Sequence, residues 1–315
     1  MIIRLIRNAC AATLAITGSC AWAACGDVSS TNLIAAYEAA AAAHTGGYEI
    51  PAGLNMWVTL VDETGKVCQV YTKNGGATAG NSAWLGSRVI SAQKANTANA
   101  FSLDGYAIST ANLYTAVQGE NSLFGLQFSN PVDASEAYVG NPANFGKYKN
   151  GKSKDPLVGK RIGGVNVFGG GLALYNSDGK KIGAIGVSGD TSCRDHAFAW
   201  RMRTSLAMHP MDNGKWLPNN QAKETPDAHA GAGETKGTGI TTYNIDKNGV
   251  VQSVSNPLKD ATYGDEMVLR GGTADSYWTD NWSHPTCPGS ILNIAGGQST
   301  NTKDNGILID AAPAP

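Results

Sequence analysis

The sequence predicts an α+β fold in which an antiparallel sheet is flanked by helices, with long insertions and a C-terminal extension. Apolar β-hairpin patterns lie between helical patterns, and this order favours a sheet covered by helices. The repeated strand–helix alternation of a doubly wound parallel sheet is absent. Glycine contributes 39 of the 315 residues and charged residues only 16%. This composition is typical of a loop-rich protein and not of a long-helix bundle.

The first predicted elements are a helix and a hairpin. Ser30 or Thr31 can cap a helix through the alanine-rich stretch that stops before Gly46-Gly47. Residues 55–62 and 67–72 are rich in β-branched side chains and are joined by the turn sequence ETGK. They predict a β-hairpin.

Helical patterns follow this hairpin. A long helix is expected to begin near Asn81 or Ser82 and to end near Ala100, and a shorter one to cover Ser109–Val117. The apolar run Leu123–Phe128 predicts a strand.

The next part of the chain contains a polar excursion, a second hairpin and a final helix. Residues 131–160 are rich in Asn, Gly, Pro and Lys and predict a surface insertion. Residues 165–175 and 180–189 form the arms of a hairpin whose turn carries Asp178-Gly179. The final helix is expected over Ser192–Met208.

The first residues predict a signal peptide. Arg4 and Arg7 precede the apolar stretch Ala9–Ser19, and Ala21-Trp22-Ala23 offers a cleavage site. The apolar stretch is too short to span a bilayer. The mature protein is therefore expected to be periplasmic or secreted, with lipidation at Cys25 as the second alternative.

Three regions follow from these assignments. Residues 1–23 are the signal peptide, residues 24–208 the α+β domain, and residues 209–315 a loop-rich extension. The extension contains a third possible hairpin at residues 241–254. No later segment is apolar enough to span a membrane.

The charge balance argues against two classes of partner. Without the two arginines of the signal peptide, 22 basic residues (24 − 2) face 25 acidic ones. This balance and the absence of a basic cluster exclude nucleic acid and anionic membranes as expected partners.

The cysteines predict disulfides. Two of the six cysteines lie in the signal peptide, so an even number remains for an oxidising compartment. Four cysteines permit three pairings, and sequence proximity favours pairing the first with the second and the third with the fourth. The four are Cys25, Cys68, Cys193 and Cys287.

Several common catalytic motifs are absent. Gly183, Gly186 and Gly189 are spaced G-x-x-G-x-x-G, which differs from the dinucleotide fingerprint. Ser188 lies one residue short of a G-x-S-x-G elbow. Neither nucleotide binding nor serine hydrolysis is therefore expected.

The histidines are the candidate metal ligands. Cys193 and His196 resemble half a zinc site, but no second Cys/His pair stands at metal spacing. His284 lies three residues before Cys287, as His196 lies three after Cys193. If these cysteines pair, both imidazoles could border one pocket and ligate a haem iron.

Two polar side chains near these histidines have open roles. Asp195 could fix the tautomer of His196, or it could complement the helix dipole while His196 is a buried structural residue. Lys94 could lay its stem over apolar surface, or it could pair with a carboxylate or a propionate. His209 is expected to be solvated.

The segments 56–67, 91–101, 169–190 and 195–200 resemble motifs of the GlcG/HbpS haem-binding family, which includes the C-terminal domain of PduO-type proteins. The resemblance implies a profilin-like (GlcG-like) fold, homo-oligomers and tetrapyrrole binding. His196 departs from it, because the family usually has an acidic residue there. The family motif positions are Lys94, Thr97, Gly170, Gly186, Ser188, Gly189 and Asp195.

These inferences predict an exported protein that binds haem, or a related tetrapyrrole such as a corrinoid, without a covalent bond. It would serve storage, scavenging or redox sensing. One alternative is an enzyme that uses His196 and Asp195 as an acid–base pair on a small substrate. Another is an interaction or assembly module without catalytic activity.

Overall fold

The computed structural model describes the core of the predicted α+β domain and short strands beyond it. The predicted signal peptide lies outside the described residues. The described residues are 24–43, 54–119, 121–212, 215–216, 242–245, 251–254, 265, 292–293 and 298–299.

A four-stranded antiparallel sheet with the strand order β2-β1-β6-β5 forms the centre of the fold. The two predicted hairpins supply all four strands, and β1 joins them by pairing with β6 from Trp57–Ser188 to Asp62–Gly183. The α+β prediction is therefore confirmed. The strands are β1 (Trp57–Asp62), β2 (Val67–Thr72), β5 (Gly171–Tyr175) and β6 (Lys181–Ser188).

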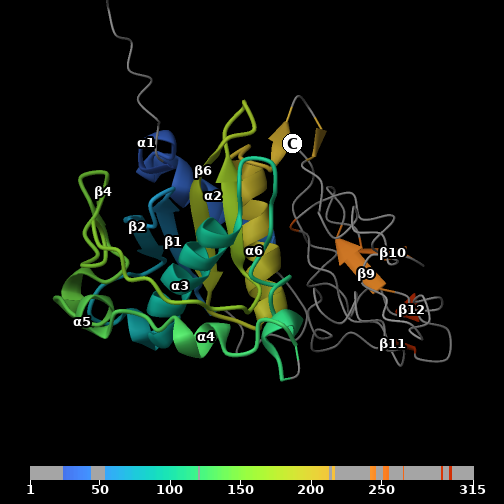
Figure 1. The fold of residues 1–315 in the computed structure, drawn as a ribbon. Helices are drawn as coiled ribbons and strands as arrows, with labels where there is room; N and C mark the ends of the chain where they lie inside the picture. The colour runs from blue at the N-terminus through green and yellow to red at the C-terminus, as the bar shows by residue number, and fades with distance from the viewer. Residues whose placement is uncertain are drawn as a thin grey trace, which may run out of the picture.

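Helices cover both faces of this sheet (Figure 1). Helix α3 contacts β1, β5 and β6, whereas α6 contacts β5 and β6 and packs against α2. The hydroxyl of Ser29 accepts a hydrogen bond from the Asn32 N–H at 3.1 Å, so the cap of α2 lies before the predicted Ser30 or Thr31. The helices are α1 (Ala24–Asp27), α2 (Ser30–Ala43), α3 (Gly86–Phe101) and α6 (Ser192–Ser205).

Three sequence predictions between α3 and β5 need correction. Helix α3 begins at Gly86, after the short 3₁₀ turn η1 (Ala79–Asn81), and not at residue 81 or 82. Of the helix predicted over 109–117, only η2 (Thr115–Val117) is helical, as a 3₁₀ turn. The strand predicted over 123–128 is wrong, because this run forms turns and α4 (Leu126–Ser129). A short apolar run does not by itself distinguish a strand from a helical turn.

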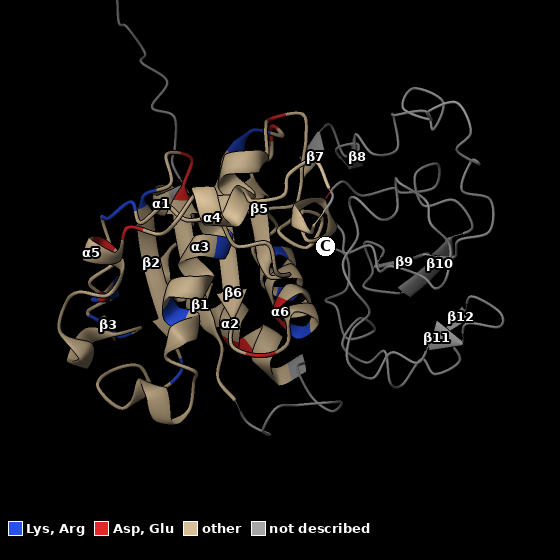
Figure 2. Cartoon of the chain, turned by 60° about the horizontal axis from the view of Figure 1, so that its bottom comes forward, with Lys and Arg blue, Asp and Glu red and all other residues tan. Residues whose placement is uncertain are grey.

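The predicted insertion lies along the edge strand β2, where Figures 1 and 2 both show it. The N–H of Val67 donates to the Lys160 carbonyl at 2.8 Å, and the Gly159 N–H donates to the Val67 carbonyl at 2.8 Å. The N–H of Thr72 donates to the Gly146 carbonyl at 3.3 Å. The insertion therefore satisfies backbone groups that an edge strand would leave exposed. Its elements are α5 (Ala134–Ala137), η3 (Pro142–Asn144), β3 (Tyr148–Lys149) and β4 (Lys152–Ser153).

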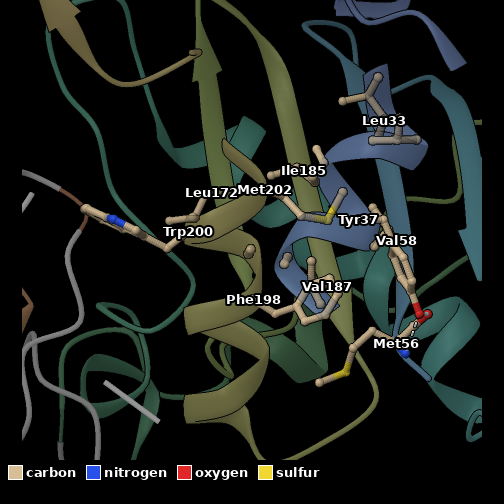
Figure 3. Packing of buried hydrophobic residues seen from close by; sticks show 14 of the residues in the cluster. Leu33, Tyr37, Met56, Val58, Leu172, Ile185, Val187, Phe198, Trp200 and Met202 are labelled. Atoms are coloured by element: carbon tan, nitrogen blue, oxygen red, sulfur yellow. Dashed lines mark hydrogen bonds between the residues drawn. The ribbon is translucent and has the colours of Figure 1, made fainter. Parts of the chain in front are cut away.

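The sheet is buried on both faces, as its apolar strands require. Val58 and Leu60 of β1 belong to the cluster shared with α2 and α6, part of which is drawn in Figure 3. Trp57 and Val61 belong to the opposite cluster, beneath α3. The α3 side uses small side chains that allow the helix to lie close to the sheet, namely Ala92, Ala95 and Ala98.

In the part of the chain that the structure describes, six short strands follow α6 and pair in three antiparallel ribbons. The pairing of Val251 with Ile245 and of Val254 with Thr242 confirms the third predicted hairpin. Among the described residues, no helix is both long and apolar enough to cross a membrane. The strands are β7 (Met211–Asp212), β8 (Lys215–Trp216), β9 (Thr242–Ile245), β10 (Val251–Val254), β11 (Leu292–Asn293) and β12 (Gln298–Ser299).

One predicted disulfide is confirmed. Cys25 and Cys68 are bonded and join α1 to β2, with their Cα atoms 5.1 Å apart. Cys193 is also disulfide-bonded. Its partner lies outside the described residues, so the pairing with Cys287 stays a prediction.

Candidate functional site

A buried ion pair connects the two faces of the sheet at the ends of β5 and β6. The Lys94 ammonium, from α3, lies 2.7 Å from Oδ2 of Asp195, in the first turn of α6. It also donates to the Val187 carbonyl of β6 at 3.2 Å. Lys94 is 1% exposed and Asp195 is 2% exposed. Of the two roles predicted for Lys94, pairing with a carboxylate is therefore confirmed.

The start of α6 fixes the Asp195 carboxylate. Thr191 is the N-cap, and its hydroxyl accepts a hydrogen bond from the Arg194 N–H. The Asp190 N–H donates to Oδ1 of Asp195 at 2.9 Å. One carboxylate oxygen thus caps the loop before the helix, while the other faces Lys94. Asp195 also complements the positive end of the helix dipole.

Two glycines allow α3 and α6 to approach the strands this closely. Gly170 has φ +119°, and a Cβ there would lie 2.4 Å from the Val187 carbonyl oxygen and 3.3 Å from the Lys94 ammonium. A Cβ on Gly186 would lie 1.9 Å from the Ser91 carbonyl oxygen of α3. Any larger residue would displace the backbone that holds the ion pair.

Two further predicted site residues, Thr97 and Ser188, make structural contacts. The Thr97 hydroxyl donates to the Gln93 carbonyl at 2.8 Å and accepts from the Asn166 N–H at 2.9 Å. Thr97 is fully buried. Ser188 is 4% exposed and pairs with Trp57 in the sheet. Thr97 thus anchors the segment before β5, and Ser188 ends β6 next to Val187.

Burial opposes the charges of the ion pair. Desolvation raises the pKa of Asp195 to about 6, although the neighbouring Lys94 charge acts to lower it. Desolvation also lowers the pKa of Lys94, against the attraction of Asp195. The pKa values of the two groups therefore move toward each other, as is common at functional sites.

The predicted iron ligand His196 lies in the interior and not at the mouth of a cavity. His196 is 0% exposed, and the centroid of its imidazole ring lies 6.2 Å from that of the Trp200 ring. Both oxygens of the adjacent Asp195 are used by Lys94 and Asp190. The second predicted ligand, His284, lies outside the described residues.

A second imidazole lies near the same tryptophan. The rings of Trp200 and His209 are 6.2 Å apart, and His209 is 4% exposed. The prediction that His209 is solvated is therefore wrong. Burial and the Arg203 charge lower the pKa of His209 to about 3, so its ring is neutral. In Figure 3 the Trp200 side chain points away from Phe198.

Sequence reasoning missed two buried ion pairs that involve α6, a helix on which Figure 2 shows both signs of charge. Arg194 lies 3.0 Å from Asp190, and their i, i+4 spacing is a signal that could have indicated the pair. Arg203 pairs with Asp265 and lies over the Trp200 ring at 4.8 Å. No sequence signal connects residues 203 and 265, because they are 62 positions apart.

Comparisons with known proteins concern this same part of the chain. A family model described as "Haem degrading protein HbpS-like" matches residues 32–202. No curated protein matches the chain.

Two solved structures are similar to the chain at low identity. Klebsiella pneumoniae protein ORFY, assigned to the family DUF336, is 21% identical with a TM-score of 0.36, and the match covers 57% of this chain and 90% of that one. A structure described as a PduOC:haem complex is 22% identical with a TM-score of 0.37, and the match covers 58% of this chain and 94% of that one.

Proposed function

This chain belongs to the HbpS-like family, whose model matches more than half of it, and we propose from this premise that it binds haem without a covalent bond. The observation that carries the proposal is the matched range, residues 32–202. This range contains all four strands of the central sheet, helix α3, most of helix α6, and the Lys94–Asp195 pair. The family resemblance predicted from sequence is confirmed by the same match.

Two imidazoles, one on α6 and one shortly after it, are donor groups of the kind that haem iron takes. Haem iron commonly takes an axial imidazole in apolar surroundings. His196 supplies an imidazole next to the Trp200 indole, and His209 supplies a neutral imidazole that also lies near that indole. Since His196 has no exposed surface, ligation by His196 requires the surrounding side chains to move.

The Lys94 ammonium is a poor candidate for a propionate partner. It already contacts the Asp195 carboxylate and the Val187 carbonyl, and it is buried. We therefore assign Lys94 and Asp195 a positioning role: they join α3 to the start of the helix that carries His196.

A second candidate is haem degradation, because the family description names that activity. The alternative of a small-substrate enzyme that uses His196 and Asp195 is less supported, since both side chains are buried and Asp195 is bound to Lys94. We further propose that the protein is exported to the periplasm or the exterior and assembles into homo-oligomers. Its role would be storage, scavenging or redox sensing.

The test is a hemin titration of the mature, disulfide-intact protein, followed by its Soret absorption. We expect a saturable Soret shift in the wild type and a smaller or displaced shift in His196→Ala. His209→Ala tests the other imidazole beside Trp200 in the same way. An absence of any stoichiometric shift would overturn the haem proposal, and an unchanged spectrum in both variants would remove the imidazoles as ligands.

The same sample separates binding from degradation. A reductant and oxygen are added to the haem-loaded protein, and the Soret band is followed together with released iron. A stable band supports binding alone. Loss of the band with stoichiometric iron release, and none with free hemin treated in parallel, supports degradation.

A further inference from the structure

Three potential metal ligands meet at the opposite end of the sheet from the Lys94–Asp195 pair. The sulfurs of Cys25 and Cys68 and a carboxylate oxygen of Asp62 all lie within 4.8 Å of one another. Cys25 comes from α1, Asp62 ends β1, and Cys68 lies in β2. In this structure the two sulfurs are joined as a disulfide.

The β1–β2 turn holds the Asp62 carboxylate in one orientation. Its Oδ1 accepts hydrogen bonds from the Thr64 N–H at 2.9 Å, the Thr64 hydroxyl at 2.6 Å and the Lys66 N–H at 3.0 Å. Its Oδ2 points to the sulfurs and lies 3.8 Å from Sγ of Cys25. Fixing one oxygen by hydrogen bonds in this way leaves the other oriented as a ligand.

Two further carboxylates, Asp27 and Glu63, belong to residues near these ligands in the chain. Burial raises the pKa of Asp27, and Glu63 lies close enough for its charge to raise that pKa further. Asp27 on α1 and Glu63 beside Asp62 each have one buried carboxylate oxygen without a hydrogen-bond partner among the described residues. The Lys66 ammonium lies 3.4 Å from Oδ2 of Asp62, but the Lys66 side chain is 42% exposed and can turn to solvent. When the disulfide is opened and both thiols lose their protons, two negative charges are added beside Asp62, and a bound divalent cation would balance them.

We propose that Cys25, Cys68 and Asp62 form a redox-gated site for a borderline divalent cation of the Zn²⁺ type. A dithiol reductant opens the disulfide: its two thiols become a disulfide, and their two hydrogens end on Cys25 and Cys68. Binding of the metal displaces these two protons as the two sulfur–metal bonds form. Two thiolates and one carboxylate leave the fourth tetrahedral position for water. The site does not depend on the haem proposal.

The test uses Co²⁺ as a spectroscopic probe on the full mature chain. One sample is oxidised and the other is reduced with a phosphine that carries no metal, and free thiols are counted in both. We expect the reduced protein to bind one Co²⁺ with a thiolate-to-metal charge-transfer band, and the oxidised protein to show none. Cys25→Ser should abolish the band although Cys193 and its partner remain. Asp62→Asn keeps an oxygen for the turn but replaces Oδ2 with an amide nitrogen, and should bind about tenfold more weakly or worse.

The matched control is Asp133→Asn, since the Asp133 carboxylate also accepts from a following backbone N–H, that of Ser135, but lies at α5. Its affinity should equal that of the wild type. Equal affinity in Asp62→Asn, or no band in a fully reduced and folded protein, overturns the proposal. If reduction unfolds the chain, addition of Zn²⁺ should restore its circular dichroism, and failure to do so also overturns it.

Discussion

Two buried ion pairs extend from the same helix, α3, toward different parts of the molecule. Lys94 crosses the end of the sheet to Asp195 of α6, with one contact of 2.7 Å. Arg88, six positions earlier, holds Asp155 of the insertion through two contacts, of 2.9 Å and 2.5 Å. One pair joins the two helical layers, and the other fastens the insertion to the domain.

The surroundings of the two pairs differ more than their burial does. The Asp155 carboxylate also accepts from the N–H groups of Gly146 and Leu157, at 2.8 Å and 2.9 Å. The Arg88 guanidinium donates to the Ala137 carbonyl and lies 3.9 Å above the Phe145 ring. Almost every polar group of this pair is therefore satisfied within the insertion, which makes it a structural clamp.

The choice of cation explains the different chemistry. Arginine stays charged in proteins, so the Arg88 pair cannot exchange its proton. Lysine loses its proton more easily when buried, and burial lowers the pKa of Lys94 while it raises that of Asp195 to about 6. The clamp thus fixes an insertion, whereas the lysine pair lies next to the candidate ligand His196 and has shifted pKa values.

The largest effect is expected for Arg88→Met. Asp155 would remain buried without its cation, at a cost of about 5 kcal/mol in the free energy of unfolding. The contacts with Ala137 and Phe145 would also be lost. Urea unfolding measures the cost, and limited proteolysis should cut within residues 131–160 first. A loss below about 1 kcal/mol would show that the pair is not a clamp.

Lys94→Met should cost about 3 kcal/mol near neutral pH, and its cost should depend on pH. Without Lys94, the pKa of Asp195 rises above about 6, and therefore further above the ordinary aspartate value of 3.8. A carboxyl with a raised folded-state pKa is fully tolerated below the unfolded pKa, and stability is lost as pH rises through the folded pKa. Each pH unit between the two values costs about 1.4 kcal/mol.

Urea unfolding of wild type and Lys94→Met at about pH 4 and about pH 7.5 checks this expectation, since the difference between them should shrink at the lower pH. The double variant Lys94→Met, Asp195→Leu should recover most of the lost stability, because no buried charge remains. A cost that does not depend on pH would contradict the raised pKa of Asp195 on which this prediction rests.

The two pairs also show what the sequence could predict. Both hairpins, the strands β9 and β10 and the helices α2, α3 and α6 follow from local patterns, because the apolar periodicity and turn residues are contained within each segment. A carboxylate or propionate partner for Lys94 is one of two alternatives that the sequence leaves open, and the resemblance places both Lys94 and Asp195 at motif positions of one family. These predictions rest on residues that are close in sequence or that belong to a shared motif.

The remaining features could not be predicted, because their cause lies in tertiary contacts. Arg88 and Asp155 are 67 positions apart, and the polar insertion gave no sign that it would pair with β2. The apolar composition of the run 123–128 predicts a strand. In the structure α4 begins within this run, at Leu126, which packs against the small cluster of Ile108 and Val117. The burial of His196 was also not predictable, because a helix face is covered or exposed according to what packs on it.

An intermediate effect is expected for Gly186→Ala, which tests how closely α3 must lie for the Lys94 pair to form. The new Cβ would be placed 1.9 Å from the Ser91 carbonyl oxygen, so α3 must move away from the sheet. Overpacking of this kind costs about 2 kcal/mol. Gly105→Ala is the matched control, because a Cβ there meets no atom within 4 Å. Thermal unfolding of both variants measures the difference, and equal stability would show that the approach is not tight.

The smallest effect is expected for Lys160→Ala, which removes an ion pair from the insertion without touching the clamp. Its ammonium lies 2.8 Å from Glu136, but the two side chains are 44% and 35% exposed. Water and salt screen such a pair, so its loss should cost less than about 1 kcal/mol. The Lys160 carbonyl, which accepts from Val67, is kept in the variant. Urea unfolding that shows a cost as large as that of Arg88→Met would mean that distance, and not burial, decides the strength of these pairs.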